Sequence, residues 1–295
     1  MVSNLSIFAI SVGILISFGI PLGVLVYLIV KYKGENAIYP FVFGCLGFFI
    51  FQVIIRIPLV GMFNLSPGAS EFISNQYVMY IFMVALTAAI VELIPRYIGS
   101  KIMRKRGDKF LNGFALGMGH GGIEAMILIG INYISYIMYA LIINAGNFDN
   151  MISDAKAQGL DVTAYSTLRD TLVDTKSIMF FLAGYERIVT MIIQVALTLL
   201  VMYYVVKKKD FVGIVLCIFA HTMIDFTTVL ISGLSTRYLG KVLNETLTVV
   251  LTYVFLTVIA AAAVYFIIRV KKELDEETKK GKLEEQKESE KKYLV

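Results

Sequence analysis

The sequence predicts an all-α polytopic membrane protein, a transmembrane helical bundle of about seven spans with its N-terminus outside and its C-terminus inside the cell. Of its 295 residues, 58% are hydrophobic and only 17% are charged, which is far from the balance of a soluble domain. The hydrophobic residues occur in runs of 20 or more, and ~20 such residues in a helix cross the hydrocarbon core of a bilayer. Basic residues gather in alternate loops.

Each hydrophobic run is interpreted as one span. The fourth is the longest and contains a glycine-rich stretch, residues 117–122, where we expect a bend or a partly re-entrant segment. The first run has no basic region before it and no small-residue cleavage site after it, as a signal peptide would, so we expect it to be retained. The predicted spans are residues 5–30, 38–63, 77–99, 110–145, 178–206, 211–234 and 244–270.

The loops predict the orientation, because cytoplasmic loops carry an excess of lysine and arginine. Placing the N-terminus outside puts most basic residues on the inner side, whereas the reverse orientation would expose them outside. The inner basic clusters are Lys31 and Lys33, residues 101–109, residues 207–209, and the segment from Arg269 onward.

We expect one membrane domain, residues 1–270, followed by a charged cytosolic tail, residues 271–295. The domain includes a long acidic outer loop, residues 146–177, which either caps the outer face or is a solvated loop with a short helix. Cys45 and Cys217 match no metal or redox spacing, so we expect free thiols. No nucleic-acid signature is present.

Charged residues inside the spans are the main functional indication, since each costs ~2.5–3.5 kcal/mol at mid-bilayer on insertion scales. Three pairs among them are spaced four residues apart, and each pair therefore lies on one helix face. The candidate functional residues among them are Arg56, Glu92, Arg96, His120, Glu124, Glu186, Arg187, His221 and Asp225.

Both histidines of the chain fall at a similar depth. At ~1.5 Å per residue, His120 lies about 16 Å beyond Lys109 and His221 about 17 Å beyond Asp210. Glu92 lies roughly 13 Å from the basic end of its own span. The sequence therefore predicts one buried polar layer between the cytoplasmic half and the midplane, contributed by three helices.

Some of these intramembrane charged residues could have a purely structural role. Arg56 and Glu186 are expected in the outer half as a structural ion pair, because buried charges need partners. Glu92 and Arg96 can likewise form an intrahelical pair with the arginine extending to lipid headgroups.

The chemistry of the layer favours hydrolysis within the membrane. Imidazole transfers protons near neutral pH, and a buried carboxylate can activate water. Two histidines with carboxylates can also bind zinc, although the H-E-x-x-H and G-x-S-x-G motifs are absent. No lysine lies in mid-span, which excludes a retinal Schiff base.

Four sequence motifs, taken together and in their order along the chain, resemble those of the YhfC family, a group of predicted intramembrane proteases. That family is similar to the CAAX-processing (CPBP) glutamic proteases, to PrsW, and to the scaffold subunit of gamma-secretase. The G-H-G-G-x-E-A motif is the most specific. The motifs are Glu92-Leu-Ile-Pro-Arg96, Gly119-His120-Gly121-Gly122-Ile123-Glu124-Ala125, Glu186-Arg187 and His221-Thr-Met-Ile-Asp225.

The resemblance implies a glutamic-type mechanism and a role for each motif. Glu92 supplies the base that activates water, and His120 assists it. His221 and Asp225 form the oxyanion site, and Arg96 fixes the glutamate.

Two positions depart from the related proteases. Val91 stands where they commonly have the first of two adjacent glutamates, so Glu92 or Glu124 has to serve as the base. Gln194 stands where they often have a further histidine, and it can donate a hydrogen bond but cannot transfer protons. Both differences also favour the interpretation that this chain is a catalytically inactive member of the family it resembles.

The leading hypothesis is an intramembrane endopeptidase of the bacterial plasma membrane, acting by Glu- and His-activated water on a membrane-embedded or lipid-proximal protein or peptide. No cofactor or metal is expected, and a zinc-dependent version stays open. The alternatives are a non-catalytic membrane scaffold and a proton-coupled transporter. The expected supporting residues are Gln194, Glu186, Arg187 and Arg56.

Overall fold

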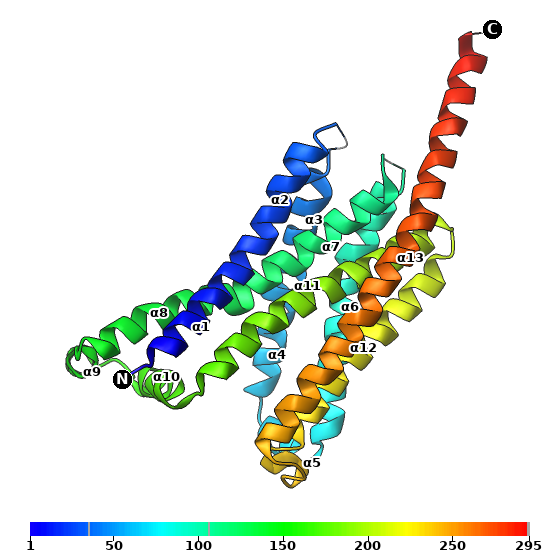
Figure 1. Cartoon of the computed structure of the whole chain (residues 1–295). Coiled ribbons are helices and arrows are strands. Elements are labelled where there is room, and N and C mark those ends of the chain that lie inside the picture. The colour runs from blue at the N-terminus through cyan, green and yellow to red at the C-terminus, as the bar shows by residue number, and fades with distance from the viewer. Residues whose placement is uncertain (35, 106, 294–295) are drawn as a thin grey trace. The chain divides into compact units, whose positions relative to one another are not determined.

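The computed structural model describes residues 1–34, 36–105 and 107–293, and these residues form helices and loops without a strand. The all-α prediction and the seven spans are confirmed, whereas the N-out orientation stays a prediction. Figure 1 shows the helices in chain order. The helices long and apolar enough to cross a membrane are Asn4–Lys31, Ile38–Asn64, Tyr77–Met103, Lys109–Asn144, Ser177–Val206, Asp210–Gly233 and Glu245–Leu283.

Three spans contain a stretch of wider π-helix. The first two stretches, η1 (Leu15–Gly19) and η2 (Phe49–Arg56), each end two residues before a proline, Pro21 and Pro58. A proline lacks the N–H that bonds the carbonyl four residues earlier, so the preceding turn loses its α-helical pairing. The third, η3 (Met126–Gly130), has no such explanation.

The expected bend at residues 117–122 is wrong. α7 (Lys109–Ala125) runs through these glycines as a regular α-helix, and the departure from α geometry begins only at Met126. Glycines are tolerated within a helix where neighbouring helices pack tightly against them. The glycines of α7 allow such close packing.

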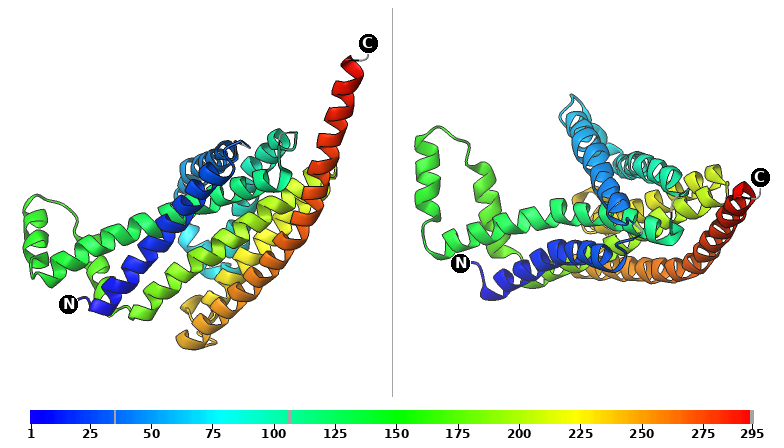
Figure 2. Two further views of the ribbon diagram at one scale, coloured as in Figure 1. Left: turned by 45° about the horizontal axis from the view of Figure 1, so that its top comes forward. Right: turned by 90° about the horizontal axis from the view of Figure 1, so that it is seen from above.

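The described chain forms two compact units, the first made of Met1–Gly23 and Glu124–Ile188. In it, α1 (Asn4–Ile14) packs along α8 (Ile131–Asn144). The predicted outer loop holds two helices that also contact α8. Phe148 and Leu172 bury their side chains in the core of this unit. Figure 2 shows both short helices, α9 (Phe148–Ala157) and α10 (Thr163–Asp174).

The second unit contains Val24–Ile123 and Val189–Val295. Its centre is α6, which packs along α12 and α3, and α12 packs along α13. The last span continues without a break into the predicted tail, so both belong to one helix in Figure 2. The bounds are α2 (Ile20–Lys31), α3 (Ile38–Phe48), α4 (Ile57–Asn64), α5 (Ala69–Asn75), α6 (Tyr77–Met103), α11 (Ser177–Val206), α12 (Asp210–Gly233), η4 (Arg237–Leu239) and α13 (Glu245–Tyr293).

Glycines hold α7 very close to its two neighbours in this unit. Gly113, Gly117 and Gly121 recur every four residues, and a methyl group on any of them would press into α11. Gly119 is in backbone contact with α3, and Gly44 of α3 faces α7 in the same way. Small residues at this spacing allow helix backbones to approach within a membrane, and here they hold the α7 histidine in place.

Candidate active site

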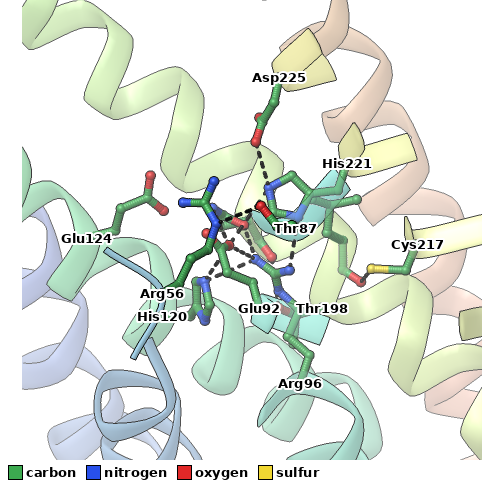
Figure 3. Close-up of polar contacts among 12 residues, drawn as sticks. Arg56, Thr87, Glu92, Arg96, His120, Glu124, Thr198, Cys217, His221 and Asp225 are labelled. Carbon is green, nitrogen blue, oxygen red and sulfur yellow. Dashed lines mark hydrogen bonds and ion pairs between the residues drawn. The ribbon is translucent and has the colours of Figure 1, made fainter. Parts of the chain in front are cut away.

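Three helices of the second unit bring the predicted polar layer together. α6 carries Glu92 and Arg96, α7 carries His120, and α12 carries His221. All four side chains are buried. The layer predicted from helix counting is therefore one cluster, shown in Figure 3.

The cluster is centred on one oxygen atom, Glu92 Oε2. Arg96 Nη2 lies 2.9 Å and His120 Nε2 3.0 Å from it. Gln194 of α11 donates to it from Nε2 at 3.4 Å, and His221 Nε2 lies 3.8 Å away. Arg96 also donates to the side-chain oxygen of Gln194. Four polar groups thus surround a single carboxylate oxygen away from water.

Arg96 determines where the proton of His221 lies. Its Nη1 is 3.4 Å from His221 Nδ1, and arginine can only donate, so Nδ1 accepts and a neutral ring carries its proton on Nε2. That nitrogen faces Asp225 Oδ2 at 3.3 Å as well as Glu92. His221 therefore presents an N–H to both carboxylates.

His120 occupies a different position in the proton network. Its Nε2 lies 3.0 Å from Arg96 Nη2 and 3.0 Å from Glu92 Oε2. One nitrogen thus faces both a donor and an acceptor, and it can exchange a proton with the carboxylate. The ring of Phe48 packs edge-on against this imidazole, with centroids 5.2 Å apart, and fixes its orientation.

Asp225 marks the accessible side of the cluster. Its side chain is 38% exposed, whereas that of Glu92 is 5% exposed. Asp225 lies one helical turn from His221 on α12, as its spacing predicts. A substrate or water would reach Glu92 past this residue.

Arg56 ends the π-helical stretch η2 and reaches α6. It donates to the carbonyl of Val84 at 2.6 Å and to Thr87 Oγ1 at 3.3 Å. Short π-helical stretches often mark functional sites. The predicted ion pair with Glu186 joins residues of different units and stays a prediction.

The Glu186-Arg187 motif belongs to a second buried ion-pair group, within the first unit. Arg187 pairs with Glu186 and lies 3.8 Å from Glu124 Oε1. Glu124 and Arg187 are both buried. Glu124 also follows His120 by one turn of α7, so the G-H-G-G-x-E-A motif contributes to both groups.

Comparison with known proteins identifies the family. The sequence model of the family described as "YhfC intramembrane metalloprotease" matches residues 16–251. The chain belongs to this family. It is also 28% identical over 273 residues to the "Uncharacterized membrane protein YhfC" of Bacillus subtilis (strain 168), covering 92% of this chain and 99% of that protein. No solved structure matches the chain significantly.

The family assignment confirms the predicted resemblance and agrees with a multi-pass protein of a bacterial plasma membrane. Every candidate site residue, from Arg56 to Asp225, lies inside the matched range. The family description names a metalloprotease. A metal ion in this cluster would require ligand atoms that are free to bind it.

The side-chain types suit a metal, but their arrangement does not. Glu92, His120 and His221 of the second unit supply one carboxylate and two imidazoles, which are side-chain types that bind metal ions. However, the Arg96 guanidinium already hydrogen-bonds Glu92 Oε2 and His120 Nε2. A metal ion at these atoms would meet a fixed positive charge. With Arg96 in these contacts, the cluster does not fit a metal ion.

Two site residues could not be found from the sequence. Thr87 receives a hydrogen bond from Arg56, and Phe48 packs on His120. Both are ordinary residues of a transmembrane helix, and neither stands in a motif. Only the packing of α3 and η2 on α6 brings them to the site.

Proposed function

We propose that this YhfC family member is an intramembrane endopeptidase that hydrolyses a peptide bond of a membrane-embedded or lipid-proximal substrate. The observation that carries the proposal is the convergence of Arg96, His120, Gln194 and His221 on one buried oxygen of Glu92. These four neighbours come from α6, α7, α11 and α12, so four helices direct a polar group at the same carboxylate oxygen.

Glu92 acts as the general base in this mechanism. It takes a proton from a water molecule while the water oxygen attacks the carbonyl carbon of the substrate. His120 Nε2, 3.0 Å from the same carboxylate oxygen, accepts this proton and returns it to the amide nitrogen as the C–N bond breaks. Positioned proton transfer of this kind typically accelerates a reaction by about 10²–10⁴-fold.

His221 stabilises the oxyanion that forms during the attack. Its Nε2–H faces the accessible side of the cluster, near Asp225, and donates to the negative oxygen. Asp225 holds the imidazole in this orientation. Such preorganised donors are worth about 2.7–4 kcal/mol in a transition state. Arg96 is a positioning residue, because it holds Glu92 and sets the tautomer of His221.

A non-catalytic scaffold is the second candidate, favoured by Val91 and Gln194. The same buried network joins α6, α7, α11 and α12, and removing one partner of a buried ion pair costs about 3–5 kcal/mol. A scaffold would depend on the network for folding and would not require a proton acceptor at Glu92.

Mapping of new protein N-termini separates these candidates. We expect cells with the wild-type protein to show termini within or beside the spans of other membrane proteins, and His221→Ala to remove them because the oxyanion loses its donor. Quantitative N-terminal peptide profiling of membranes provides the measurement. Val229→Ala, an exposed position of the same helix, should match the wild type.

Identical profiles of the wild type and folded His221→Ala would contradict the protease. A stable partner that copurifies with both would then support the scaffold. If purified protein in liposomes instead moves protons with a substrate, the polar cluster is a relay of a transporter.

Removal of metal is expected to leave proteolysis unchanged, because Arg96 already neutralises Glu92. Elemental analysis of purified protein and cleavage in the presence of a membrane-permeant zinc chelator test this. About one zinc per chain, with activity lost on chelation and restored by zinc, would transfer water activation to a metal.

A further inference from the structure

An apolar pocket is lined by α4, α5, α6 and the last residue of η2. Its volume is about 280 Å³, room for a large aliphatic or aromatic side chain. It contains one cationic side chain, that of Arg56. The lining residues that matter for its function are Arg56, Leu59, Val60, Met83, Thr87 and Val91.

The pocket adjoins the catalytic carboxylate through α6. Tyr80, Val84, Thr87 and Val91 line it, and their spacing of three or four residues forms one stripe of the helix. The stripe ends at Val91, one residue before Glu92. Arg56, which also lines the pocket, points toward Glu92 and His120 in Figure 3. A group bound at this end of the pocket therefore lies near the cluster.

Exposed lining residues on membrane-spanning helices indicate that the pocket opens toward the apolar phase of the membrane. The side chains of Leu59 and Met83 are 60% and 43% exposed on helices that cross the bilayer. An occupant therefore enters sideways from the membrane and is itself apolar. Lipid tails are as apolar as leucine, so hydrophobicity alone cannot select a substrate over a lipid chain.

Polar groups at the inner end of the pocket provide that selection. The guanidinium of Arg56 has five N–H donors but makes two hydrogen bonds, to Val84 and Thr87, and no ion pair among the described residues of this unit. Arg56 thus brings spare N–H donors to the border of the pocket.

An unwound peptide segment has the complementary chemistry. A transmembrane helix must open before its peptide bond can be attacked, and each backbone group freed in lipid costs several kcal/mol. A lipid chain has neither an N–H nor a carbonyl to place at this end. The N–H groups of Arg56 can satisfy a freed carbonyl.

We propose that this pocket is the substrate-binding subsite, which takes a large apolar side chain, leucine, methionine or phenylalanine, of the residue beside the scissile bond. Arg56 donates to the backbone carbonyl of the unwound substrate. This inference rests on the proposed endopeptidase activity and names its substrate class, a transmembrane segment with a large apolar residue at the cleavage site.

The test compares the residues that flank cleavage sites for three forms of the full-length protein in the same N-terminal profiling. Val60→Phe fills the pocket, and the matched control Val78→Phe adds the same bulk at an exposed position of α6 outside it. We expect wild type and control to prefer leucine, methionine or phenylalanine. Val60→Phe should shift the preference to alanine or glycine about 10-fold, within the ~10–200-fold effect of misfit in an apolar pocket.

Two further variants test the same subsite if Val60→Phe fails to fold. Met83→Ala enlarges the pocket and should favour phenylalanine over leucine. Arg56→Gln should lower cleavage at all sites alike without changing the side-chain preference, because it loses a backbone contact. Unchanged preference in both folded pocket variants would overturn the subsite while leaving the protease intact. No wild-type cleavage at all would overturn the protease itself, and the subsite with it.

Discussion

Replacing Glu92 with glutamine is expected to reduce cleavage by about 10²–10⁴-fold, the usual contribution of a general base. Glutamine keeps the size and hydrogen-bonding reach of the side chain but cannot accept a proton from water. The rate of cleavage of a substrate found by terminal mapping, measured with purified protein in liposomes, provides the test.

The same substitution leaves Arg96 as an unpaired buried cation, so its effect on folding has to be separated from its effect on chemistry. Losing the partner of a buried ion pair costs about 3–5 kcal/mol. The double variant Glu92→Gln/Arg96→Met removes both charges and should restore the amount of folded protein without restoring cleavage. An active double variant would show that the base is elsewhere, with Glu124 as the next candidate.

The fold could be predicted because the bilayer requires it. Backbone groups in lipid must be paired within a helix, so the length of each apolar run predicted a span. The depth of Glu92, His120 and His221 followed from the fixed rise of a helix. That these residues share one cluster followed from the cost of leaving any of them alone in the membrane.

Contacts between helices could not be predicted in the same way. The sequence indicated that Arg96 pairs with Glu92, but not that its guanidinium also reaches His120, His221 and Gln194. These contacts depend on how α7, α11 and α12 rotate about α6, which hydropathy does not specify. They also change the interpretation of the histidines, because a metal site and an arginine-held cluster use the same residue types.

The glycines of α7 show the limit of local propensity. Gly117 and Gly121 suggested a bend, because glycine weakens an isolated helix by about 1 kcal/mol relative to alanine. In the structure the same residues allow α11 to pack directly on the α7 backbone. Tertiary packing thus decides the conformation, and the glycines specify the distance between helices.

Gly119→Ala is expected to destabilise the protein strongly. A Cβ atom at this position would lie 1.9 Å from the carbonyl oxygen of Phe41 and 2.8 Å from its carbonyl carbon. Both are backbone atoms, so no side chain can turn away, and α3 and α7 must separate. Overpacking typically costs about 1–3 kcal/mol and occasionally more, and we expect the upper end of this range.

The loss of cleavage should accompany the loss of stability, because His120 follows Gly119 directly and moves with the α7 backbone. Unfolding by sodium dodecyl sulfate in mixed micelles measures stability, and the liposome assay measures cleavage. Gly44→Ala, whose Cβ would lie 2.1 Å from the carbonyl oxygen of Leu116, should reproduce both effects from the opposite side of the contact.

Gly23→Ala is the matched control, since nothing lies within 4 Å of a Cβ atom placed there in α2. It should keep full activity and gain slightly in stability, because alanine is the better helix former by about 1 kcal/mol. If Gly119→Ala behaves like Gly23→Ala, α3 and α7 are not in backbone contact at this position. The orientation of His120 would then depend on Phe48 and Glu92 instead of on the close approach of the two helices.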